Sequence, residues 1–499
     1  MSSLEPSAAA RFDPALVPDL RRHTARGTVI NGMFLIGANA LGLVKGLVVA
    51  SLLATSTYGV WGLLGVTLGT LLLLGSVGID DKYIQQDDPD QKRAFEIAFT
   101  LQSLLAALFM VIIVVAIPIF SLIYDQPDMI APGIALAAAM PALALQTPLW
   151  VHYRRMDFVK QRTLQVVDPV VSLVVTTVLA LAGLEIWALV IGALAGAWSA
   201  AIAIVATSPY SLRFRWERGA LAEYTSFSWP LFLAALSTVL VAQVPMAVTS
   251  RQLGAAAVGG IALALNVSQF ASRVDDIVTQ TLYPAICAVK DRADLLFESF
   301  WKSNRLALLW AAPCGTALAL FAADFVHYVI GNKWKFAIPL LVAFGLTAVV
   351  NQVAFNWSAF FRARGQTRPI AAASLVYMAA VMAIAVPLLA VSGLTAFGVG
   401  MGLATVVFVL ARVWFLAPIF PPRAVLGHAA RGIAPTLPAA AAVLLLRLLE
   451  SGNRTPLVAV AELAAFIAIV VAVTIVSERT LLRESLGYLR RRNVAAGTV

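Results

Sequence analysis

The stretch AFEIAFTLQSLLAALFMVIIVVAIPIFSLIY occupies residues 94–124 and contains a single charged side chain, Glu96. A helix rises about 1.5 Å per residue, so about 20 apolar residues cross a bilayer core that is about 30 Å thick. Only helices and closed barrels satisfy their backbone hydrogen bonds inside that core. The stretch therefore predicts a transmembrane helix.

Similar apolar stretches follow one another along most of the chain, which is 60% hydrophobic and 12% charged with a mean hydropathy of +0.86. A soluble domain has about 25% charged residues. We predict an all-α, polytopic membrane protein with about 14 spans. They cover residues 28–54, 58–79, 94–124, 129–151, 163–183, 186–207, 224–250, 255–286, 304–330, 337–361, 369–391, 395–418, 432–450 and 456–477.

The distribution of Lys and Arg predicts the orientation, because these residues are retained in cytoplasmic loops. Of the 36 Lys and Arg residues, four lie in the opposite loops (Arg251, Lys333, Lys335, Arg454) and four lie within spans (Lys45, Arg273, Arg412, Arg447). The other 28 lie in the N-terminal segment, in every second loop and in the C-terminal tail. We therefore expect a multi-pass protein of the cytoplasmic (inner) membrane with both termini in the cytoplasm, inserted by its first span without a cleaved signal peptide.

The same pattern accounts for the net charge of +10. The basic residues are dispersed in short loops instead of forming a basic face with aromatics, which argues against nucleic acid as a partner and leaves membrane lipids as a secondary one. No loop has room for a folded soluble domain, and GxxxxGK[ST] is absent. The two cysteines, Cys287 and Cys314, suggest neither a disulfide nor a metal site.

One acidic cluster keeps an enzymatic alternative open. Asp80, Asp81, Asp87, Asp88 and Asp90 could hold a divalent cation for a membrane glycosyltransferase or polymerase. The charge pattern places this loop in the cytoplasm, and solvated loop charge is the simpler interpretation. We see no nucleophile with a base, no pair of catalytic carboxylates and no metal-ligand cluster, so we expect no catalytic residue, no metal and no enzyme.

A weak internal repeat divides the chain. LATSTYGVW (residues 53–61) aligns with LGAAAVGGI (residues 253–261), pairing Gly59 with Gly259, and GLEIWALVIG (183–192) aligns with GLTAFGVGMG (393–402). An offset of six spans preserves orientation, so the halves should relate by a pseudo-two-fold axis along the membrane normal. The predicted parts are a cytoplasmic segment 1–27, a six-helix bundle 28–207, a cytoplasmic linker 208–223, a second six-helix bundle 224–418, two additional helices 419–477 and a basic cytoplasmic tail 478–499.

The eighth span carries a polar stripe at spacings of three and four residues, which places its members on one helical face. Its members are Asn266, Gln269, Arg273, Asp276 and Gln280. Polar groups inside a membrane usually face a protein interior or a wet cavity. Arg273 either pairs with Asp276 for packing or faces a cavity and attracts an anionic headgroup, for which its planar guanidinium is suited.

The first span has a small-and-polar face that includes Asn39 and Lys45. Lys45 is either a cavity cation or a snorkelling or interhelical lysine. Gln352 and Asn356 share a face of the tenth span and are candidates to line the other half of a cavity. Pro230 and Pro245 should bend the seventh span, either as a gate or without function.

Other polar residues within spans receive structural interpretations. Asp168 precedes Pro169 and is interpreted as a feature of the start of its helix, and Asp324 and His327 as capping or interfacial residues. Arg447, Glu450 and Glu462 are expected to pair with one another.

Several segments together resemble a known family. They are LGAAAVGGIALALNVSQF (253–270), RVDDIVTQTLYPAICAVKD (273–291), YRRMDFVKQRTLQVVDPVVSLV (153–174) and GLEIWALVIGALAG (183–196). The chain resembles the polysaccharide transporters, the Wzx-type oligosaccharide flippases of the MOP superfamily. The resemblance implies two six-helix bundles around a central, commonly cationic cavity, which favours Arg273 and Lys45 as substrate contacts.

The resemblance also implies a function. We expect a flippase that moves a polyprenyl-pyrophosphate-linked oligosaccharide to the outer leaflet for exopolysaccharide, capsule or O-antigen assembly, by alternating access. A polysaccharide polymerase and chain-length machinery are the expected protein partners. No cofactor is expected, and a coupling ion would be H⁺ or Na⁺. The alternatives are a cation-coupled small-molecule exporter of the same superfamily or, less favoured, the glycosyltransferase or polymerase above.

Overall fold

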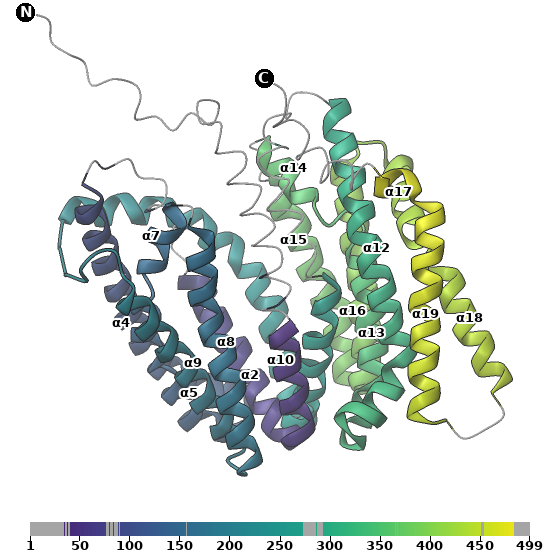
Figure 1. The fold of residues 1–499 in the computed structure, drawn as a ribbon, viewed down its shortest axis with the longest axis horizontal. Coiled ribbons are helices and arrows are strands. Elements are labelled where there is room, and N and C mark those ends of the chain that lie inside the picture. Colours follow the sequence, from purple (N-terminus) through teal and green to yellow (C-terminus); the bar gives the residue numbers. More distant parts are fainter. Residues whose placement is uncertain are drawn as a thin grey trace, which may run out of the picture.

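The computed structural model describes residues 40–75, 90–155, 157–272, 293–364, 368–450 and 454–483, together with residues 34, 37, 79, 83, 88, 286 and 366. Within these residues every regular element is a helix, which confirms the all-α prediction. Figure 1 shows the helices of the N-terminal half on one side, those of the C-terminal half on the other, and α2 and α10 between them.

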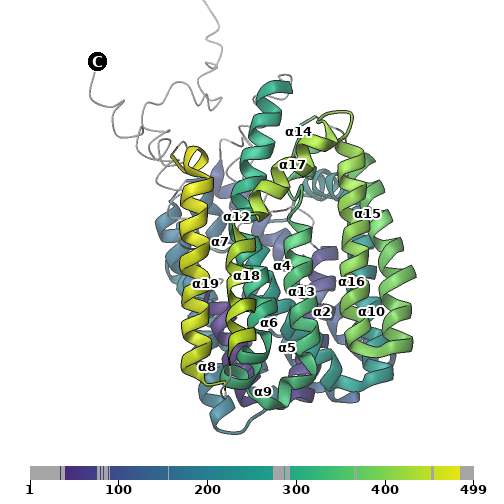
Figure 2. The same cartoon turned by 90° about the vertical axis from the view of Figure 1, so that its right-hand side faces the viewer.

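The elements fall into three consecutive groups. The first contains the helix Ala40–Leu52, α2 (Thr55–Gly75), α4 (Gln91–Tyr124), η2 (Pro127–Met129), α5 (Ile130–Leu136), α6 (Ala139–Leu145), α7 (Pro148–Arg154), α8 (Phe158–Leu181) and α9 (Ile186–Ala206). The second contains α10 (Arg218–Ser272), α12 (Ala293–Phe325), η3 (Val326–Ile330), η4 (Asn332–Ala337), α13 (Ile338–Asn351), α14 (Trp357–Ala363), α15 (Arg368–Ala380), η5 (Val381–Ala385) and α16 (Val386–Leu416). The third contains α17 (Pro422–Ile433), α18 (Thr436–Leu449) and α19 (Pro456–Ser477), which Figure 2 shows at the side of α12.

The outer surface of the helices is apolar, as a lipid environment requires. Val115, Leu122, Trp414 and Leu448 expose 59%, 75%, 77% and 81% of their surface. Soluble proteins rarely expose apolar patches of this extent. In the described part of the chain, nine helices are long and apolar enough to cross a membrane, or ten if the bent pair α17–α18 is one span. The chain is therefore a multi-pass membrane protein, while the number fourteen and the two-bundle arrangement stay predictions.

Two predicted spans are interrupted. The stretch 129–151 is divided into α5, α6 and α7, and the stretch 337–361 breaks between α13 and α14, where Ala354 has a φ of 55°. Proline at position 148 cannot donate to the carbonyl four residues earlier. The hydroxyl of Thr147 donates to that carbonyl, Ala144 O, at 2.6 Å. Hydropathy alone predicted continuous helices because it does not register these backbone bonds.

The sequence repeat has a structural counterpart. Gly183 and its repeat partner Gly393 both have positive φ, 82° and 75°. A Cβ built on Gly59 would lie 1.7 Å from the carbonyl oxygen of Ala255, and a Cβ on Gly259 would lie 2.5 Å from that of Thr55. Equivalent glycines of the two repeats thus touch reciprocally where α2 crosses α10, as a two-fold relation predicts.

Helices α18 and α19 are joined to α12 by ion pairs. Arg447 Nε lies 3.2 Å and Arg454 Nη2 lies 2.7 Å from Glu462 Oε2. Arg454 and Arg447 also bind Asp324, and hydrogen bonds to Asp324 and Glu462 raise the pKa of Arg454. The predicted pairing of Arg447 with Glu462 is confirmed. The expectation for Glu450 was wrong, because Glu450 pairs with Arg454. Of the two roles expected for Asp324, capping or interfacial, the interfacial one stays a prediction, and the structure adds its ion pairs with Arg447 and Arg454.

Candidate functional site

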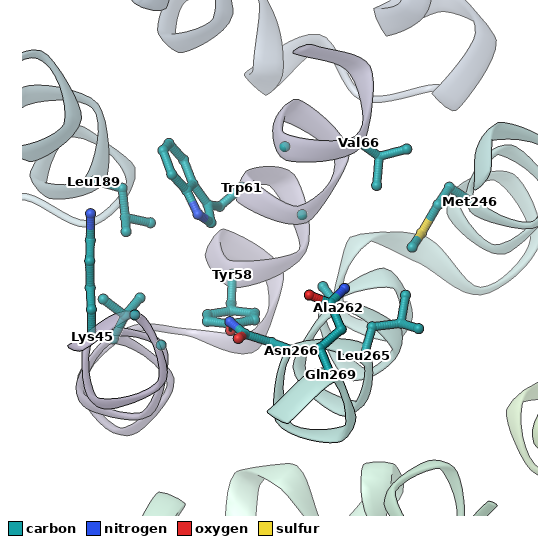
Figure 3. A pocket seen from close by; sticks show the side chains of 15 residues that line it. Lys45, Tyr58, Trp61, Val66, Leu189, Met246, Ala262, Leu265, Asn266 and Gln269 are labelled. Atoms are coloured by element: carbon teal, nitrogen blue, oxygen red, sulfur yellow. Dashed lines mark hydrogen bonds between the residues drawn. The ribbon is translucent and has the colours of Figure 1, made fainter. Parts of the chain in front are cut away.

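A cavity of about 390 Å³ lies between the helix Ala40–Leu52, α2, α9 and α10. Its polar lining comes from Lys45 on the first helix, Tyr58 and Trp61 on α2, and Asn266 and Gln269 on α10 (Figure 3). Leu189 and Met246 add apolar wall from α9 and from the first part of α10. Segments from both halves of the chain therefore build one cavity, as the sequence repeat suggested.

Among the described residues that line this cavity, Lys45 is the one that carries a charge. Its Nζ donates to Ser172 Oγ on α8 at 2.5 Å, and the charge of Asp168 on the same helix acts on it. In Figure 3 the lysine side chain runs along the wall on the side of Leu189. The structure thus places Lys45 in both of its predicted settings, at a cavity and in contact with a neighbouring helix.

Asp168 is not at the start of its helix, and that expectation was wrong. Helix α8 begins at Phe158, and its N-cap is Asp157, whose side chain accepts from Lys160 N. Asp168 therefore lies well inside the helix. The Asp–Pro dipeptide was misleading because proline is tolerated within a membrane helix when neighbouring groups satisfy the backbone.

The opposite wall presents two amides and an aromatic pair. Asn266 Nδ2 lies 3.5 Å from the hydroxyl of Tyr58, and a Cβ built on Gly46 would lie 2.7 Å from the same nitrogen. The side chains of Asn266 and Gln269 are exposed to the cavity. Amides, a phenol and an indole supply hydrogen bonds and flat faces, a mixture that suits polar ligands such as sugars.

One end of the molecule is closed over this cavity by contacts between the halves. Because the distribution of Lys and Arg predicts that this end faces away from the cytoplasm, we call it the outer end, defined by residues 51–54, 122–126, 250–254 and 331–335. Trp334 is fully buried, packs edge-on against Tyr58 with ring centroids 5.4 Å apart, and donates from Nε1 to Ala50 O at 2.8 Å. Lys333 Nζ donates to Ser51 O at 2.8 Å and to Leu53 O at 2.5 Å.

A second set of contacts closes the same end, again with side chains of the second half as donors and carbonyls of the first half as acceptors. Arg251 Nε and Nη2 donate to the carbonyls of Ile123 and Leu122 at 2.7 and 2.9 Å. Ser250 Oγ donates to Tyr124 O at 2.6 Å. In each set, side chains of one half bind backbone carbonyls at a helix end of the other half. We refer to the two sets together as the outer latch.

Several predicted site residues are not at this cavity. Gln352 and Asn356 are buried, with exposures of 0% and 2%, in the break between α13 and α14. Asn304 donates to Gln352 O at 2.9 Å and Asn356 donates to Ser303 Oγ at 2.5 Å. These residues hold the break against α12 and do not line the cavity described above.

For the remaining predicted site residues, the structure gives either no position or only the helix to which they belong. Asn39, Arg273, Asp276 and Gln280 lie outside the described residues. Pro230 and Pro245 lie in α10, and the backbone of this helix departs from helical φ and ψ at Gly254. Their gating role stays a prediction.

The acidic cluster is described only in part. Asp90 caps α4 by accepting from Arg93 N at 3.0 Å, and Asp88 Oδ1 accepts from Asp90 N at 2.9 Å. Among the described residues no group of three or more His, Cys, Asp or Glu side chains could hold a metal ion. Asp90 and Asp88 therefore form hydrogen bonds at the N-terminal end of α4.

Sequence reasoning missed Tyr58, Trp61, Asp168 and Ser172 as parts of the site. Tyr58 and Trp61 flank Gly59 in the repeat, and an aromatic residue beside a repeat glycine was an available signal. Ser172 lies one turn after Asp168, but which face of α8 meets Lys45 depends on packing. No local pattern reveals that face.

The helices and the cavity define a multi-pass membrane protein with a polar cavity between its two halves, and solved structures of known proteins share its fold. The fold is shared with a structure of the lipid II flippase MurJ in an inward closed conformation, with a TM-score of 0.71 at 11% identity over 91% of this chain and 100% of that one. It is also shared with an inward-facing multidrug resistance MATE family transporter of the MOP superfamily, with a TM-score of 0.65 at 13% identity over 80% and 99% of the chains.

The family described as "Polysaccharide biosynthesis protein" matches residues 48–339, and the chain belongs to this family. The resemblance found in the sequence is thereby confirmed. The chain is 22% identical to the succinoglycan biosynthesis transport protein ExoT of Rhizobium meliloti (strain 1021) over 63% of each protein. It is 30% identical to an uncharacterized membrane protein in the cps region of Klebsiella pneumoniae, over 28% of this chain and 30% of that protein.

A third relative is the lipopolysaccharide biosynthesis protein WzxC of Escherichia coli (strain K12), which is 33% identical over 19% of each protein. The matched stretches span less than two thirds of each of these three relatives. The chain is thus a multi-pass membrane protein of this polysaccharide biosynthesis family.

Proposed function

We propose that this protein flips a polyprenyl-pyrophosphate-linked oligosaccharide from the inner to the outer leaflet of the cytoplasmic membrane. The product would serve the assembly of exopolysaccharide, capsule or O-antigen. The observation that carries the proposal is the cavity in which Lys45 stands opposite Asn266, Gln269 and Tyr58. An ammonium group suits a pyrophosphate, and amides with aromatic rings suit the attached sugars.

Alternating access is the proposed mechanism. The outer latch closes one end of the cavity with contacts between the two halves. A carrier of this kind needs a second state in which these contacts are broken. The substrate would then shift the balance of the two states by the difference in its affinity for them.

The direct test follows the lipid-linked intermediate in a strain that lacks the gene. We expect undecaprenyl-pyrophosphate-linked repeat units to accumulate on the cytoplasmic side and surface polysaccharide to be lost, with both restored by the gene on a plasmid. Accumulation on the outer side, or an unchanged polysaccharide, would contradict the proposal. The accompanying expectations are an inner-membrane location, cytoplasmic termini, and partnership with a polymerase and chain-length machinery.

The two alternatives give different results in the same strain. A small-molecule exporter would change drug resistance and leave the polysaccharide intact. A glycosyltransferase or polymerase would leave truncated or unpolymerised sugars instead of complete units on the wrong side of the membrane. Replacing the five aspartates at positions 80, 81, 87, 88 and 90 with Asn would abolish function only under the enzymatic alternative.

A further inference from the structure

Asp168 and Ser172 lie one helical turn apart on the face of α8 that meets Lys45. Lys45 Nζ donates to Ser172 Oγ at 2.5 Å, and Lys45 and Asp168 act on each other electrostatically. Lys45 also lines the cavity. A single ammonium group therefore stands between a carboxylate in the wall and the space that a substrate would occupy.

The carboxylate of Asp168 is packed against α9. A Cβ built on Gly196 would lie 2.4 Å from Asp168 Oδ1 and 2.9 Å from Ser172 Cβ. The side chain therefore fits only because position 196 is glycine. A carboxylate packed between two membrane helices is poorly hydrated, and its charge depends on a nearby cation.

Few charged groups face this carboxylate. The helix Ala40–Leu52 contributes Lys45, and α9 carries no charged residue along its whole length. On α8 itself, Arg162 donates to Gln165 Oε1 at 2.6 Å. Among the described residues, Lys45 is the charge that acts on Asp168.

One lysine cannot neutralise two anions at the same time. When a pyrophosphate draws the ammonium of Lys45 into the cavity, the partly buried Asp168 loses the positive charge that acts on it. The neutral acid is then the favoured form of the carboxyl group, because burial without an opposite charge disfavours the ionised form.

We propose that Asp168 binds a proton when the pyrophosphate of the substrate takes Lys45 away from it, so that proton uptake is linked to substrate binding. This inference rests on the proposed function. The proton comes from solution and forms an O–H bond on the carboxyl group. It returns to solution when the substrate leaves and the charge of Lys45 acts on Asp168 again.

The test measures binding of farnesyl-pyrophosphoryl-glucose to the full purified chain at several pH values. Both phosphates of this probe are esterified, so its charge stays constant near neutral pH. We expect its Kd to fall as the pH is lowered from about 8 to about 6, by up to about tenfold per pH unit for one linked proton. Infrared difference spectra should show the C=O stretch of a protonated carboxylic acid when the probe is added.

Three variants separate the linkage from general effects. Asp168→Asn should bind the probe tightly at every pH and lose the infrared band, because Lys45 is then free. Lys45→Met should bind weakly at every pH. Asp157→Asn makes the same chemical change at the N-cap of the same helix, where Asn caps equally well, and should keep the dependence of the unmodified protein.

The possible failures are distinguishable. Probe binding that is equally tight at every pH, without the infrared band, would overturn the linkage and leave the flippase proposal intact. A dependence on sodium at constant pH, or a pH dependence that persists in Asp168→Asn, would overturn the assignment of the proton to Asp168. Absence of binding in the unmodified protein and all variants would contradict the proposed function and this inference together. If Asp168→Asn does not fold, the infrared spectrum of the unmodified protein still decides.

Discussion

Lys45 illustrates how one residue can serve both a wall and a cavity. Its aliphatic part covers apolar surface while its ammonium group binds Ser172 and lies in the field of Asp168. The aromatic and amide groups across the cavity carry no charge. Electrostatic recognition of an anion in this cavity therefore depends on Lys45 among the residues that the structure describes.

The first prediction concerns this charge. Lys45→Ala should weaken binding of a pyrophosphate-linked probe by about 10- to 100-fold, because a hydrogen bond to a charged group contributes about 1.5–3 kcal/mol. Lys45→Arg should retain most of the affinity. Surface polysaccharide and probe binding are the measurements, with protein amount in the membrane as the control. Full polysaccharide output by a well-expressed Lys45→Ala variant would exclude Lys45 from the substrate path.

The sequence could single out Lys45, Asn266 and Gln269 because each is a polar residue within an apolar span. It could not show that Lys45 bonds to Ser172, which lies 127 positions away. Gln352 and Asn356 gave the same polar signal but lie in helix packing. Polarity within a span thus identifies residues that need a partner, and the fold decides whether that partner is another helix or a ligand.

At the scale of elements, the crossing of α2 and α10 depends on glycine. The backbone of Gly59 and that of Ala255 approach so closely that no Cβ fits between them. Contact across the repeat is reciprocal through Gly259 and Thr55. This crossing lies a few residues from the outer latch. The close packing of α2 against α10 should therefore stabilise the state in which the outer end is closed.

The second prediction tests this crossing. Gly59→Ala should force α2 and α10 apart, and overpacking typically costs about 1–3 kcal/mol, or about a 5- to 150-fold shift toward the open outer end. Labelling of Ala50→Cys from outside, in a chain with both native cysteines replaced by Ser, measures the opening. Gly69→Ala is the matched control on the same helix, since a Cβ there meets nothing within 4 Å. Equal labelling in the two variants would show that the crossing does not restrain the outer end.

A third prediction concerns the attachment of the last two helices. Glu462→Gln should lower the free energy of unfolding by about 1.5–3 kcal/mol, because Arg447 and Arg454 each lose a charged partner. Glu450→Gln is the control, since Glu450 makes one bond to Arg454 and is more exposed, 22% against 7%. Unfolding midpoints in detergent give the comparison. A larger effect from Glu450→Gln would contradict the view that Glu462 is the centre of this ion-pair cluster.

The elements themselves were largely predictable, because hydropathy and length identify apolar helices without reference to packing. The interruptions at residues 146–147 and 352–356 were not predictable in the same way. They depend on which side chains replace the missing backbone bonds, as Thr147 does for Ala144. Glycines 183 and 393 were matched by the repeat, and their similar positive φ values show that weak sequence similarity can preserve turn geometry.

At the scale of the whole molecule, the outer latch joins the two halves at one end of the cavity. Lys333 and Trp334 bind the end of the first described helix, while Ser250 and Arg251 bind the end of α4. The second half therefore holds the first half at two places of the same end. A molecule that works by alternating access must release both sets of contacts in every cycle.

The last prediction is that a reversible cross-link across the latch stops transport. Cysteines placed by Ser51→Cys and Lys333→Cys, in a chain without Cys287 and Cys314, should react with a disulfide-containing bis-maleimide because Lys333 reaches Ser51 O. Flipping of a fluorescent pyrophosphate-linked lipid in proteoliposomes should fall to background and recover when the linker is reduced. A matched cross-link between Arg155→Cys and Tyr210→Cys, which joins neighbours within one half, should leave flipping intact. Transport that continues at full rate with the latch cross-linked would mean that the outer end does not open, and the substrate would have to follow a path along the lipid-facing surface instead of through the cavity.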